Sequence, residues 1–518
     1  MKLHLQITIS LLIGFAVGVK AQLSPSEALN GMFRGINIGN TMEAPVEGTW
    51  GNPPVQQHAF DDYKNAGFTA IRIPITWDGQ TSTTSPYSIK SAWLARVDTV
   101  VSWGLKRGLF IIIDAHHETW LKTALADSGI ARQDSDIARF DSIWSQIATH
   151  FQNKSDSLIF EILNEPDPAP EAAVNALNVQ VLRLIRRTNP TRIVSYSGYM
   201  WSNSDQLVTA EIPDSSDKYL IGYYHSYDPY PFGLVGTGTY GSASDIAATK
   251  AKFDEVTSWS QENNIPVILD EFGYIDTADY NSRMCAYGTV VDQALSHGVG
   301  AYAWDDGGDF PIYNRTTGGF NEIKDILIHT YPESPNGMEI SQITSSSIEV
   351  RWHGRNSESD SIIIERGVGS ASFVHYAIVP PTDSVFVDSS IIPGNAYYYR
   401  LSMLTKDSIE MQSYPIMLNA RLTAVVERNA LYHFELYNNY PNPFNPTTRI
   451  DYQLPMNSLV TLKVYDILGR EVATLVNERE NAGTHTVKFD AVNLASGVYF
   501  CRLQAGTFTD MKKLLLLK

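Results

Sequence analysis

The stretch Leu158–Pro166, with the sequence LIFEILNEP, decides the fold. It is mostly apolar as far as Leu163 and is bounded by polar loop sequence, as expected for a strand buried in a parallel sheet. Pro166 cannot continue a sheet ladder, and it favours an extended conformation for the residue before it. Asn164 and Glu165 therefore end a buried strand, where Glu165 is either an ordinary solvated loop residue or part of a site.

Similar strand-like segments recur on both sides of this stretch, and helical sequence separates them. Lys90–Arg107, for example, places its apolar residues on one face at helical spacing. Eight strands alternating with helices are typical of a (β/α)8, or TIM, barrel, which is an α/β fold. The expected strands are 33–38, 68–75, 109–115, 158–163, 192–197, 219–224, 266–269 and 299–303.

Polar and aromatic residues follow these strands, whereas the strand bodies are aliphatic. In a TIM barrel the active site lies at the C-terminal ends of the strands. A single histidine there is more often structural, and a single tryptophan is more often core. So many polar and aromatic residues at the strand ends of one barrel indicate a functional site. They are Asn40, Arg72, His116, His117, Asn164, Glu165, His225, Tyr227, Glu271 and Trp304.

Two of these residues form a carboxylate pair. Glu165 and Glu271 end the fourth and seventh strands and would face each other across the barrel mouth. Glycoside hydrolysis needs such a pair, because one carboxyl donates a proton while the other stays ionised to attack or to activate water. The charge of Arg72 could keep one carboxylate ionised. Asn164 could bind a sugar 2-hydroxyl, and Tyr227 and the histidines supply further donors and acceptors.

Other side chains are candidates for sugar binding. Asp305 could bind sugar hydroxyls, although the loop that follows it, residues 307–309, is unusual. Trp50 and Trp120 could instead pack against loops. The tryptophans that could present flat apolar faces to sugar rings are Trp50, Trp120, Trp201 and Trp304.

Two other functional classes remain as alternatives. A non-catalytic sugar-binding protein on this fold would be expected to lack one of the two glutamates, and both are present. A metal-dependent hydrolase is disfavoured because adjacent histidines rarely chelate one ion together. We therefore expect neither a metal nor a cofactor. The candidate ligands for a metal would be Asp114, His116, His117, His225 and Asp305.

Taken together and in this order, the motifs resemble those of glycoside hydrolase family 5. The resemblance covers nearly all of residues 33–331. Its opening is most similar to endoglucanases acting on β-1,4-glucan, with mannan, xyloglucan and mixed-linkage glucan as alternative substrates. The motifs are RGINIGN at 34–40, EAPVEGTWG at 43–51, IRIP at 71–74, HH at 116–117, NEP at 164–166 and DEFG at 270–273.

The resemblance implies a role for each matched residue. Glu165 would be the acid/base and Glu271 the nucleophile of a retaining double displacement, with the two carboxyl groups about 5–5.5 Å apart. Tyr227 could donate a hydrogen bond to Glu271, while His117 would line the cleft. The other residues matched to the family's active-site positions are Arg72, His116, Asn164, His225 and Trp304.

Length and charge set further limits. The chain has 518 residues, too many for one core, and its net charge of −17 argues against nucleic acid or an anionic membrane as a partner. Residues 1–21 resemble a secretory signal peptide, with Lys2 before an apolar run and small residues near Ala21. The two cysteines, Cys285 and Cys501, fall in different expected domains, so no disulfide is predicted.

Two small all-β sandwich domains are expected after the barrel. We place the barrel at residues 22–333, a fibronectin type III-like domain at 334–424 and a final domain at 425–518. The final domain, which opens with YNNYPNPFNPTT and ends in a lysine-rich strand, resembles the C-terminal sorting domain of the type IX secretion system. This resemblance implies a protein that is secreted or held at the outer cell surface. The expected partners are a β-linked polysaccharide and the secretion machinery, and we expect a monomer.

Overall fold

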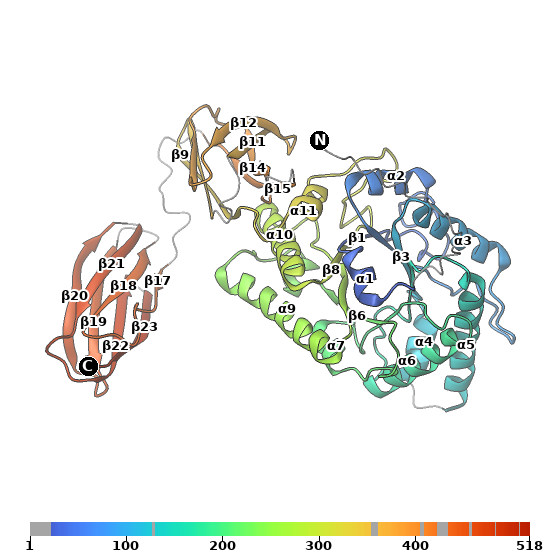
Figure 1. Ribbon diagram of the computed structural model, residues 1–518. Helices are drawn as coiled ribbons and strands as arrows, with labels where there is room; N and C mark the ends of the chain where they lie inside the picture. Colours follow the sequence, from blue (N-terminus) through green and yellow to red (C-terminus); the bar gives the residue numbers. More distant parts are fainter. Residues whose placement is uncertain are drawn as a thin grey trace, which may run out of the picture.

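The computed structural model describes residues 22–126, 130–353, 361–404, 409–421, 434–454, 458–481, 483–506 and 508–518. The signal peptide predicted at residues 1–21 lies outside these ranges. Among the described residues, no helix combines the length and the apolar character needed to cross a membrane. A barrel of alternating strands and helices comes first along the chain, and two antiparallel β domains follow it (Figure 1).

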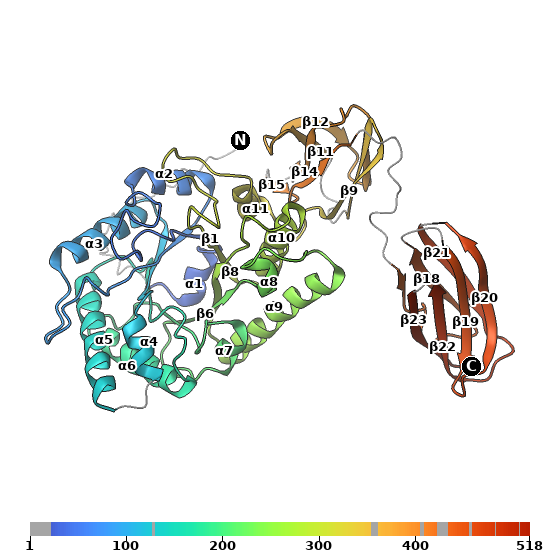
Figure 2. The same cartoon turned by 180° about the vertical axis from the view of Figure 1, so that it is seen from behind.

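The barrel is closed and parallel, as the alternating sequence predicted (Figure 2). Successive strands pair in chain order, and β1 also pairs with β8 to complete the ring. Nearly every strand residue is buried, which explains the aliphatic strand bodies. The strands are β1 (Arg34–Asn37), β2 (Ala70–Ile73), β3 (Phe110–Ile113), β4 (Leu158–Glu161), β5 (Val194–Tyr196), β6 (Leu220–Ser226), β7 (Val267–Phe272) and β8 (Gly300–Ala303).

Helices surround this barrel, and α1 lies across its N-terminal end, where Ala28 and Leu29 pack against the first residues of the strands. The C-terminal end is thereby left as the open mouth. The helices are α1 (Pro25–Asn30), α2 (Gln57–Ala66), α3 (Ser91–Leu105), α4 (Thr119–Ala126), α5 (Ile130–Phe151), α6 (Glu171–Arg186), α7 (Ser204–Thr209), α8 (Tyr230–Gly233), α9 (Ala243–Asn263), α10 (Tyr280–His297) and α11 (Ile323–His329).

Strands β6 and β7 run further than the sequence predicted. His225 belongs to β6, and Glu271 lies within β7 rather than after it. The pairing register between the two strands shifts after Tyr224, and the pairing of β7 with β8 shifts between Leu269 and Phe272. Such irregularities re-aim side chains at barrel rims. Here they occur where the two expected site residues, His225 and Glu271, lie.

The second domain is a sandwich of a three-stranded sheet, β13-β10-β9, and a larger sheet, β12-β11-β14-β15, to which β16 is added through β14. The inward-facing residues of the two sheets form its interior, and Trp352 is buried among them. Its strands are β9 (Asn336–Thr344), β10 (Ser347–His353), β11 (Ile362–Val368), β12 (Val374–Val379), β13 (Val385–Asp388), β14 (Ala396–Leu404), β15 (Glu410–Gln412) and β16 (Ile416–Asn419).

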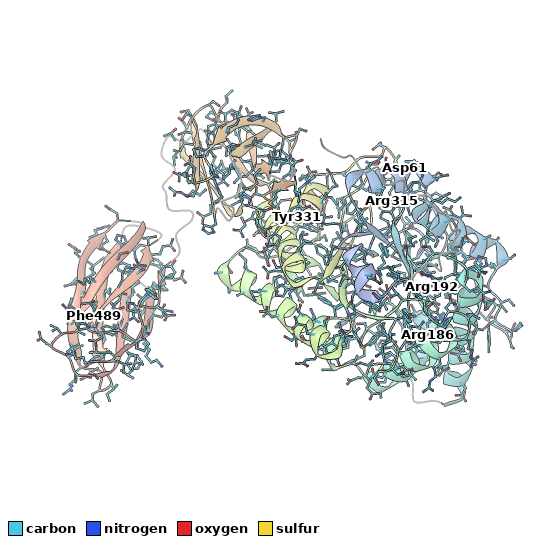
Figure 3. All side chains as sticks on the ribbon, in the orientation of Figure 1. Asp61, Arg186, Arg192, Arg315, Tyr331 and Phe489 are labelled. Carbon is cyan, nitrogen blue, oxygen red and sulfur yellow. The ribbon has the colours of Figure 1, made fainter. Side chains whose placement is uncertain are left out.

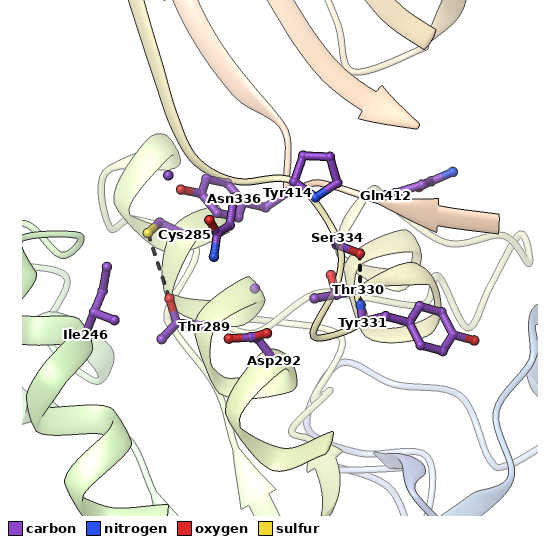
Figure 4. Close-up of a pocket in the computed structure, with 13 residues that line it drawn as sticks. Ile246, Cys285, Thr289, Asp292, Thr330, Tyr331, Ser334, Asn336, Gln412 and Tyr414 are labelled. Atoms are coloured by element: carbon purple, nitrogen blue, oxygen red, sulfur yellow. Dashed lines mark hydrogen bonds between the residues drawn. The ribbon is translucent and has the colours of Figure 1, made fainter. Parts of the chain in front are cut away.

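The second domain is docked on α10 and α11 of the barrel (Figure 4). One continuous hydrophobic core runs through both domains. Asn281 exchanges two hydrogen bonds, of 2.9 and 2.7 Å, with the backbone of Met417, and Arg400 pairs with Asp325 at 2.6 Å. Gly288 permits a close approach of the two domains, because a Cβ atom there would lie only 2.7 Å from the ring of Tyr414.

The third domain has a hydrophobic core of its own, to which Phe489 belongs (Figure 3). Its sheets have the orders β17-β18-β21 and β20-β19-β22-β23. Cys501 is free and buried there, as is Cys285 in α10. The strands are β17 (Glu435–Leu436), β18 (Thr447–Leu454), β19 (Ser458–Asp466), β20 (Glu471–Glu480), β21 (Gly483–Asp490), β22 (Gly497–Ala505) and β23 (Phe508–Leu516).

Candidate active site

A fully buried guanidinium lies at the centre of the barrel mouth. Arg72 at the end of β2 donates two hydrogen bonds to Glu161, of 2.8 and 2.6 Å, and one of 2.7 Å to Glu271. It also reaches Asn164 at 2.8 Å and Asp114 at 3.0 Å. Burial opposes its charge, but Glu161 and Asp114 raise the pKa of Arg72 well above its usual value. With 0% exposure, Arg72 supports the site from inside and does not itself face a substrate.

Both oxygens of the Glu271 carboxylate are held. Arg72 binds Oε2 at 2.7 Å, and the hydroxyl of Tyr227 donates to Oε1, also at 2.7 Å. The hydrogen bond expected from Tyr227 is therefore present. Charge-assisted hydrogen bonds from two directions fix the orientation of a carboxylate. Glu271 thus has the fixed geometry that a nucleophile requires.

Glu165 is presented by a strained turn at the end of β4. Its φ angle of 38° is in the left-handed region, which residues other than glycine rarely adopt, and not in the extended region that Pro166 favours for it. Its Oε1 lies 3.0 Å from Nδ1 of His225. Burial opposes ionisation, but the hydrogen bond and charge of His225, helped by Lys122 and Arg72, lower the pKa of Glu165 below its usual value.

The two glutamates converge as predicted. One oxygen of Glu165, one oxygen of Glu271 and a ring nitrogen of His225 all lie within 4.8 Å of one another. Retaining glycosidases place their carboxyl groups about 5–5.5 Å apart, whereas inverting enzymes need about 6.5–9.5 Å to admit a water molecule. The observed approach fits the retaining arrangement.

His225 is buried between several acids. Its Nε2 lies 3.3 Å from Oδ1 of Asp270, and its Nδ1 lies 3.9 Å from Glu271 as well as 3.0 Å from Glu165. Burial disfavours a charged imidazole, but Glu271, Asp270 and Glu165 raise the pKa of His225 well above its usual value. Burial also raises the pKa of Asp270 itself, to about 7.

Trp304, which follows β8, and His116, which follows β3, form a stacked pair. Their rings are nearly parallel, at 4°, with centroids 6.0 Å apart. Gly39 makes room for the indole, since a Cβ there would lie 2.6 Å from it. Asp114 holds Nδ1 of His116 at 2.7 Å, and burial, aided by repulsion from His117, lowers the pKa of His116 well below its usual value. His116 is therefore a neutral hydrogen-bonding group.

Asn164 and Asn40 have partners that leave part of each side chain for a substrate. The Oδ1 of Asn164 accepts from Arg72, which assigns this atom as the oxygen and leaves the amide NH2 to donate elsewhere. Asn40 is half-buried, and the carboxylate of Glu43 binds its backbone N–H. Its side-chain nitrogen lies 3.5 Å from Asp306.

Two of the tryptophans expected to bind sugar rings, Trp201 and Trp50, are exposed. Trp201 is 54% exposed in the loop between β5 and α7, and Trp50 is 48% exposed. Trp50 meets exposed His117 edge-on at 5.8 Å. Trp120 differs, because it donates to Glu118 at 2.7 Å and lies under the Arg139 guanidinium at 4.1 Å. Trp120 therefore packs α4 against α5, whereas Trp201 and Trp50 have faces open to a ligand.

Asp305 does not have the position expected for a sugar-binding residue. Its side chain is 0% exposed, and Oδ1 accepts from the backbone of Gly307 at 3.3 Å and of Ile312 at 3.0 Å. Arg315 pairs with Oδ2 at 3.3 Å. The expectation that Asp305 binds sugar hydroxyls is corrected, because its carboxylate is used inside the protein to shape the loop after β8.

The sequence profile described as Cellulase (glycosyl hydrolase family 5) matches residues 33–309, more than half of the chain, and includes both converging glutamates. This chain belongs to glycosyl hydrolase family 5. A second profile, described as a secretion system C-terminal sorting domain, matches residues 438–517.

Relatives of this family 5 member include Endoglucanase H of Acetivibrio thermocellus, 42% identical over 320 residues; these cover 60% of this chain and 34% of the relative. A solved hyperthermophilic endo-beta-1,4-glucanase in complex with substrate is 33% identical, with a TM-score of 0.55, and covers 59% of this chain and 99% of its own. A tri-modular GH5 (subfamily 4) endo-beta-1,4-glucanase from Bacillus licheniformis, 23% identical, matches 95% of this chain and 100% of its own with a TM-score of 0.63, which shows a shared fold.

The metal-ligand set considered from the sequence does not assemble. Among the described residues, two groups of three potential ligands gather within 4.8 Å, and His225 alone of the considered ligands belongs to them. One group is Glu161, His225 and Asp270, and the other is Glu165, His225 and Glu271. Arg72 already binds Glu161 and Glu271, so its guanidinium supplies the positive charge that a metal would otherwise bring.

Sequence reasoning missed three charged residues of this family 5 site. Glu161 interrupts the apolar run of β4, and Asp270 directly precedes Glu271, so both were visible as acids in buried strands. Lys122 in α4 is buried and donates to the carbonyl of His116 at 3.1 Å. No sequence signal pointed to Lys122, because a lysine in a helix is ordinarily solvated.

Proposed function

We propose that this family 5 member is an endo-β-1,4-glucanase that hydrolyses glycosidic bonds in plant polysaccharides with retention of configuration. The observation that carries the proposal is the approach of Glu165 and Glu271 within 4.8 Å. Each has a different set of partners, so two chemically similar side chains acquire two roles.

In the first step Glu271 attacks the anomeric carbon, and the bond to the leaving oxygen breaks. Arg72 and Tyr227 bind the two oxygens of the attacking carboxylate and orient it. Glu165 delivers a proton to the leaving oxygen, so that the departing chain leaves as a neutral alcohol. The product of this step is a covalent glycosyl-enzyme on Glu271.

In the second step Glu165 removes a proton from water, whose oxygen attacks the anomeric carbon. The bond to Glu271 then breaks and the free enzyme is restored. The NH2 group of Asn164, beside Glu165, is placed to donate to the sugar 2-hydroxyl, a contact that strengthens in the transition state of this reaction.

The open aromatic faces support a polysaccharide as the substrate. Trp201 and Trp304 offer flat rings, and Asn40, His116 and His117 offer hydrogen-bonding groups around the mouth. The β-1,4-glucan specificity and the endo mode of cleavage are taken from the names of the relatives, Endoglucanase H and endo-beta-1,4-glucanase. No cofactor takes part in either step.

The third domain supports export. Its match to a sorting profile at residues 438–517 indicates recognition by a secretion machinery, which would leave the enzyme outside the cell or at its surface. Residues 1–21 would act as the signal peptide, and the enzyme would work as a monomer.

The purified full chain should be assayed on carboxymethyl cellulose, mixed-linkage glucan and glucomannan. We expect the highest activity on a β-1,4-glucan, no effect of a chelator, and a β-anomer as the first product by NMR. Glu271→Gln should lower kcat by on the order of 10³-fold or more. Glu262→Gln, which changes an exposed glutamate on α9, is the matched control. An active Glu271→Gln enzyme or an α-anomer as first product would refute the mechanism.

A further inference from the structure

Two buried aspartates next to the site, Asp114 and Asp270, differ in their hydrogen bonds. Asp114 accepts from Arg72 at 3.0 Å and from the backbone of Ile75 at 2.7 Å, and it also lies 2.7 Å from His116. Within the described part of the chain, neither oxygen of Asp270 has a well-formed hydrogen bond, although the residue is 0% exposed. An unsatisfied buried carboxylate is costly and calls for an explanation beyond folding.

The charged neighbours of Asp270 indicate what it does. His225 Nε2 lies 3.3 Å from Oδ1, and Arg72 Nε lies 3.9 Å from Oδ2. Arg72 is already bound to Glu161 and Glu271, so His225 is the partner still open. The other nitrogen of the same imidazole, Nδ1, faces Glu165 at 3.0 Å. Asp270, His225 and Glu165 therefore form a continuous line from the barrel interior to the cleft.

We propose that Asp270 is a positioning residue that holds the proton of His225 on Nε2, so that Nδ1 can exchange the acid/base proton with Glu165. The proposal rests on the proposed function. A carboxylate that fixes the tautomer and orientation of a histidine acts in the same way in other enzymes that transfer protons through imidazole. Here the histidine would serve a second carboxylate instead of a hydroxyl nucleophile.

The proton balance is complete without another reactant. In the first step the proton on Nδ1 of cationic His225 moves to Glu165 and then to the leaving oxygen, as Glu271 bonds to the anomeric carbon and the bond from that carbon to the leaving oxygen breaks. His225 is left neutral, with its Nε2 proton towards Asp270. In the second step a water proton passes through Glu165 back to Nδ1, the water oxygen bonds to the anomeric carbon, and the bond to Glu271 breaks.

The surroundings of His225 favour this shared proton. Acids face it from two elements: Glu161 and Glu165 from β4 and its end, and Asp270 and Glu271 from β7. Arg72 from β2 and His116 from the end of β3 oppose a further positive charge. The pKa of His225 is nevertheless raised, with Glu271 and Asp270 outweighing burial. Removing the charge of Asp270 should therefore lower the pKa of His225.

The test compares Asp270→Asn with Asp114→Asn in the full chain. The amide at position 270 can still accept from Nε2 but carries no charge. Asp114→Asn removes a buried charge beside Arg72 without facing His225. For each enzyme, kcat/KM should be measured against pH with cellotetraose, which needs acid assistance, and with a 2,4-dinitrophenyl β-cellobioside, which does not. Thermal unfolding and Asp270→Glu, which restores the charge, separate misfolding from a proton effect.

For Asp270→Asn we expect the alkaline limb of the cellotetraose profile to move down by about one pH unit, since an adjacent opposite charge raises the pKa of an imidazole by about that much. At the optimum, cellotetraose hydrolysis should fall about tenfold more than dinitrophenyl cellobioside hydrolysis. Asp114→Asn should keep the wild-type limb and the wild-type ratio between substrates. An unmoved limb in Asp270→Asn, or an equal loss on both substrates, overturns the proposal. A wild-type enzyme inactive on cellotetraose would instead refute the proposed function.

Discussion

The two sides of the barrel mouth use buried carboxylates differently. Beside β8 and β1, Asp306 accepts from the backbone of Gly308 at 2.7 Å and of Phe310 at 2.9 Å, and Glu43 similarly binds backbone N–H groups. Beside β4 and β7, Glu165 and Glu271 meet side chains instead. Backbone donors cannot give up a proton, so the first arrangement builds loops, whereas the second can carry out proton transfer.

The largest effect should come from the proposed proton donor, Glu165. Glu165→Gln is expected to lower kcat/KM on cellotetraose by about 10³-fold, because general acid catalysis contributes about 10²–10⁴-fold. The loss on a 2,4-dinitrophenyl β-cellobioside should be much smaller. Glu43→Gln, from the loop-building side, is the contrasting variant and should not alter the ratio between the two substrates. Equal losses on both substrates in Glu165→Gln would remove its assigned role.

The hydrogen bond to the proposed nucleophile, Glu271, should have the next largest effect. Tyr227→Phe should lower kcat by about 10- to 100-fold, the equivalent of one hydrogen bond to a charged group. Steady-state kinetics on cellotetraose measure this effect. Tyr230→Phe changes an exposed tyrosine on α8 and should match the wild type. Unchanged activity in Tyr227→Phe would show that the 2.7 Å contact has no role in the reaction.

Beside β8, a change at Asp305 is expected to affect the stability of the protein and not its activity. Asp305→Asn removes the charge facing Arg315 while leaving an oxygen for the backbone of Ile312. It should cost about 1–3 kcal/mol in the free energy of unfolding. Calorimetry should detect the loss, with kcat on cellotetraose near the wild-type value at 25 °C. A lower kcat with an unchanged unfolding temperature would show that Asp305 contributes to the reaction and not to stability.

The smallest effect is expected at the exposed rim. Trp201→Ala should raise KM for cellotetraose about fivefold at unchanged kcat, equivalent to ~1 kcal/mol of lost stacking. A short aryl cellobioside, which reaches fewer subsites, serves as the comparison substrate. A fall in kcat with constant KM would mean that Trp201 supports the catalytic residues instead of holding the chain of sugars.

The barrel and its rim could be predicted because strand period, strand-end residues and their order are all local properties of the sequence. Glu165 and Glu271 were found for this reason. The prediction for Asp305 was wrong because an aspartate at a strand end can point either into the cleft or into the protein. Here the loop after β8 brings the backbone N–H of Ile312 to the carboxylate, and the sequence does not show the path of that loop. Lys122 was missed since its burial depends on how α4 packs against the mouth.

Gly288 has a consequence for how the chain unfolds. Because this glycine lets Tyr414 join the hydrophobic core of the barrel, the first two domains share one packed interior, whereas the third has its own. Domains that share a core lose their structure together. Three domains would then behave as two cooperative units, and a calorimetric scan of the full chain should resolve two heat-absorption peaks, with only the larger of them sensitive to a bulky side chain at position 288.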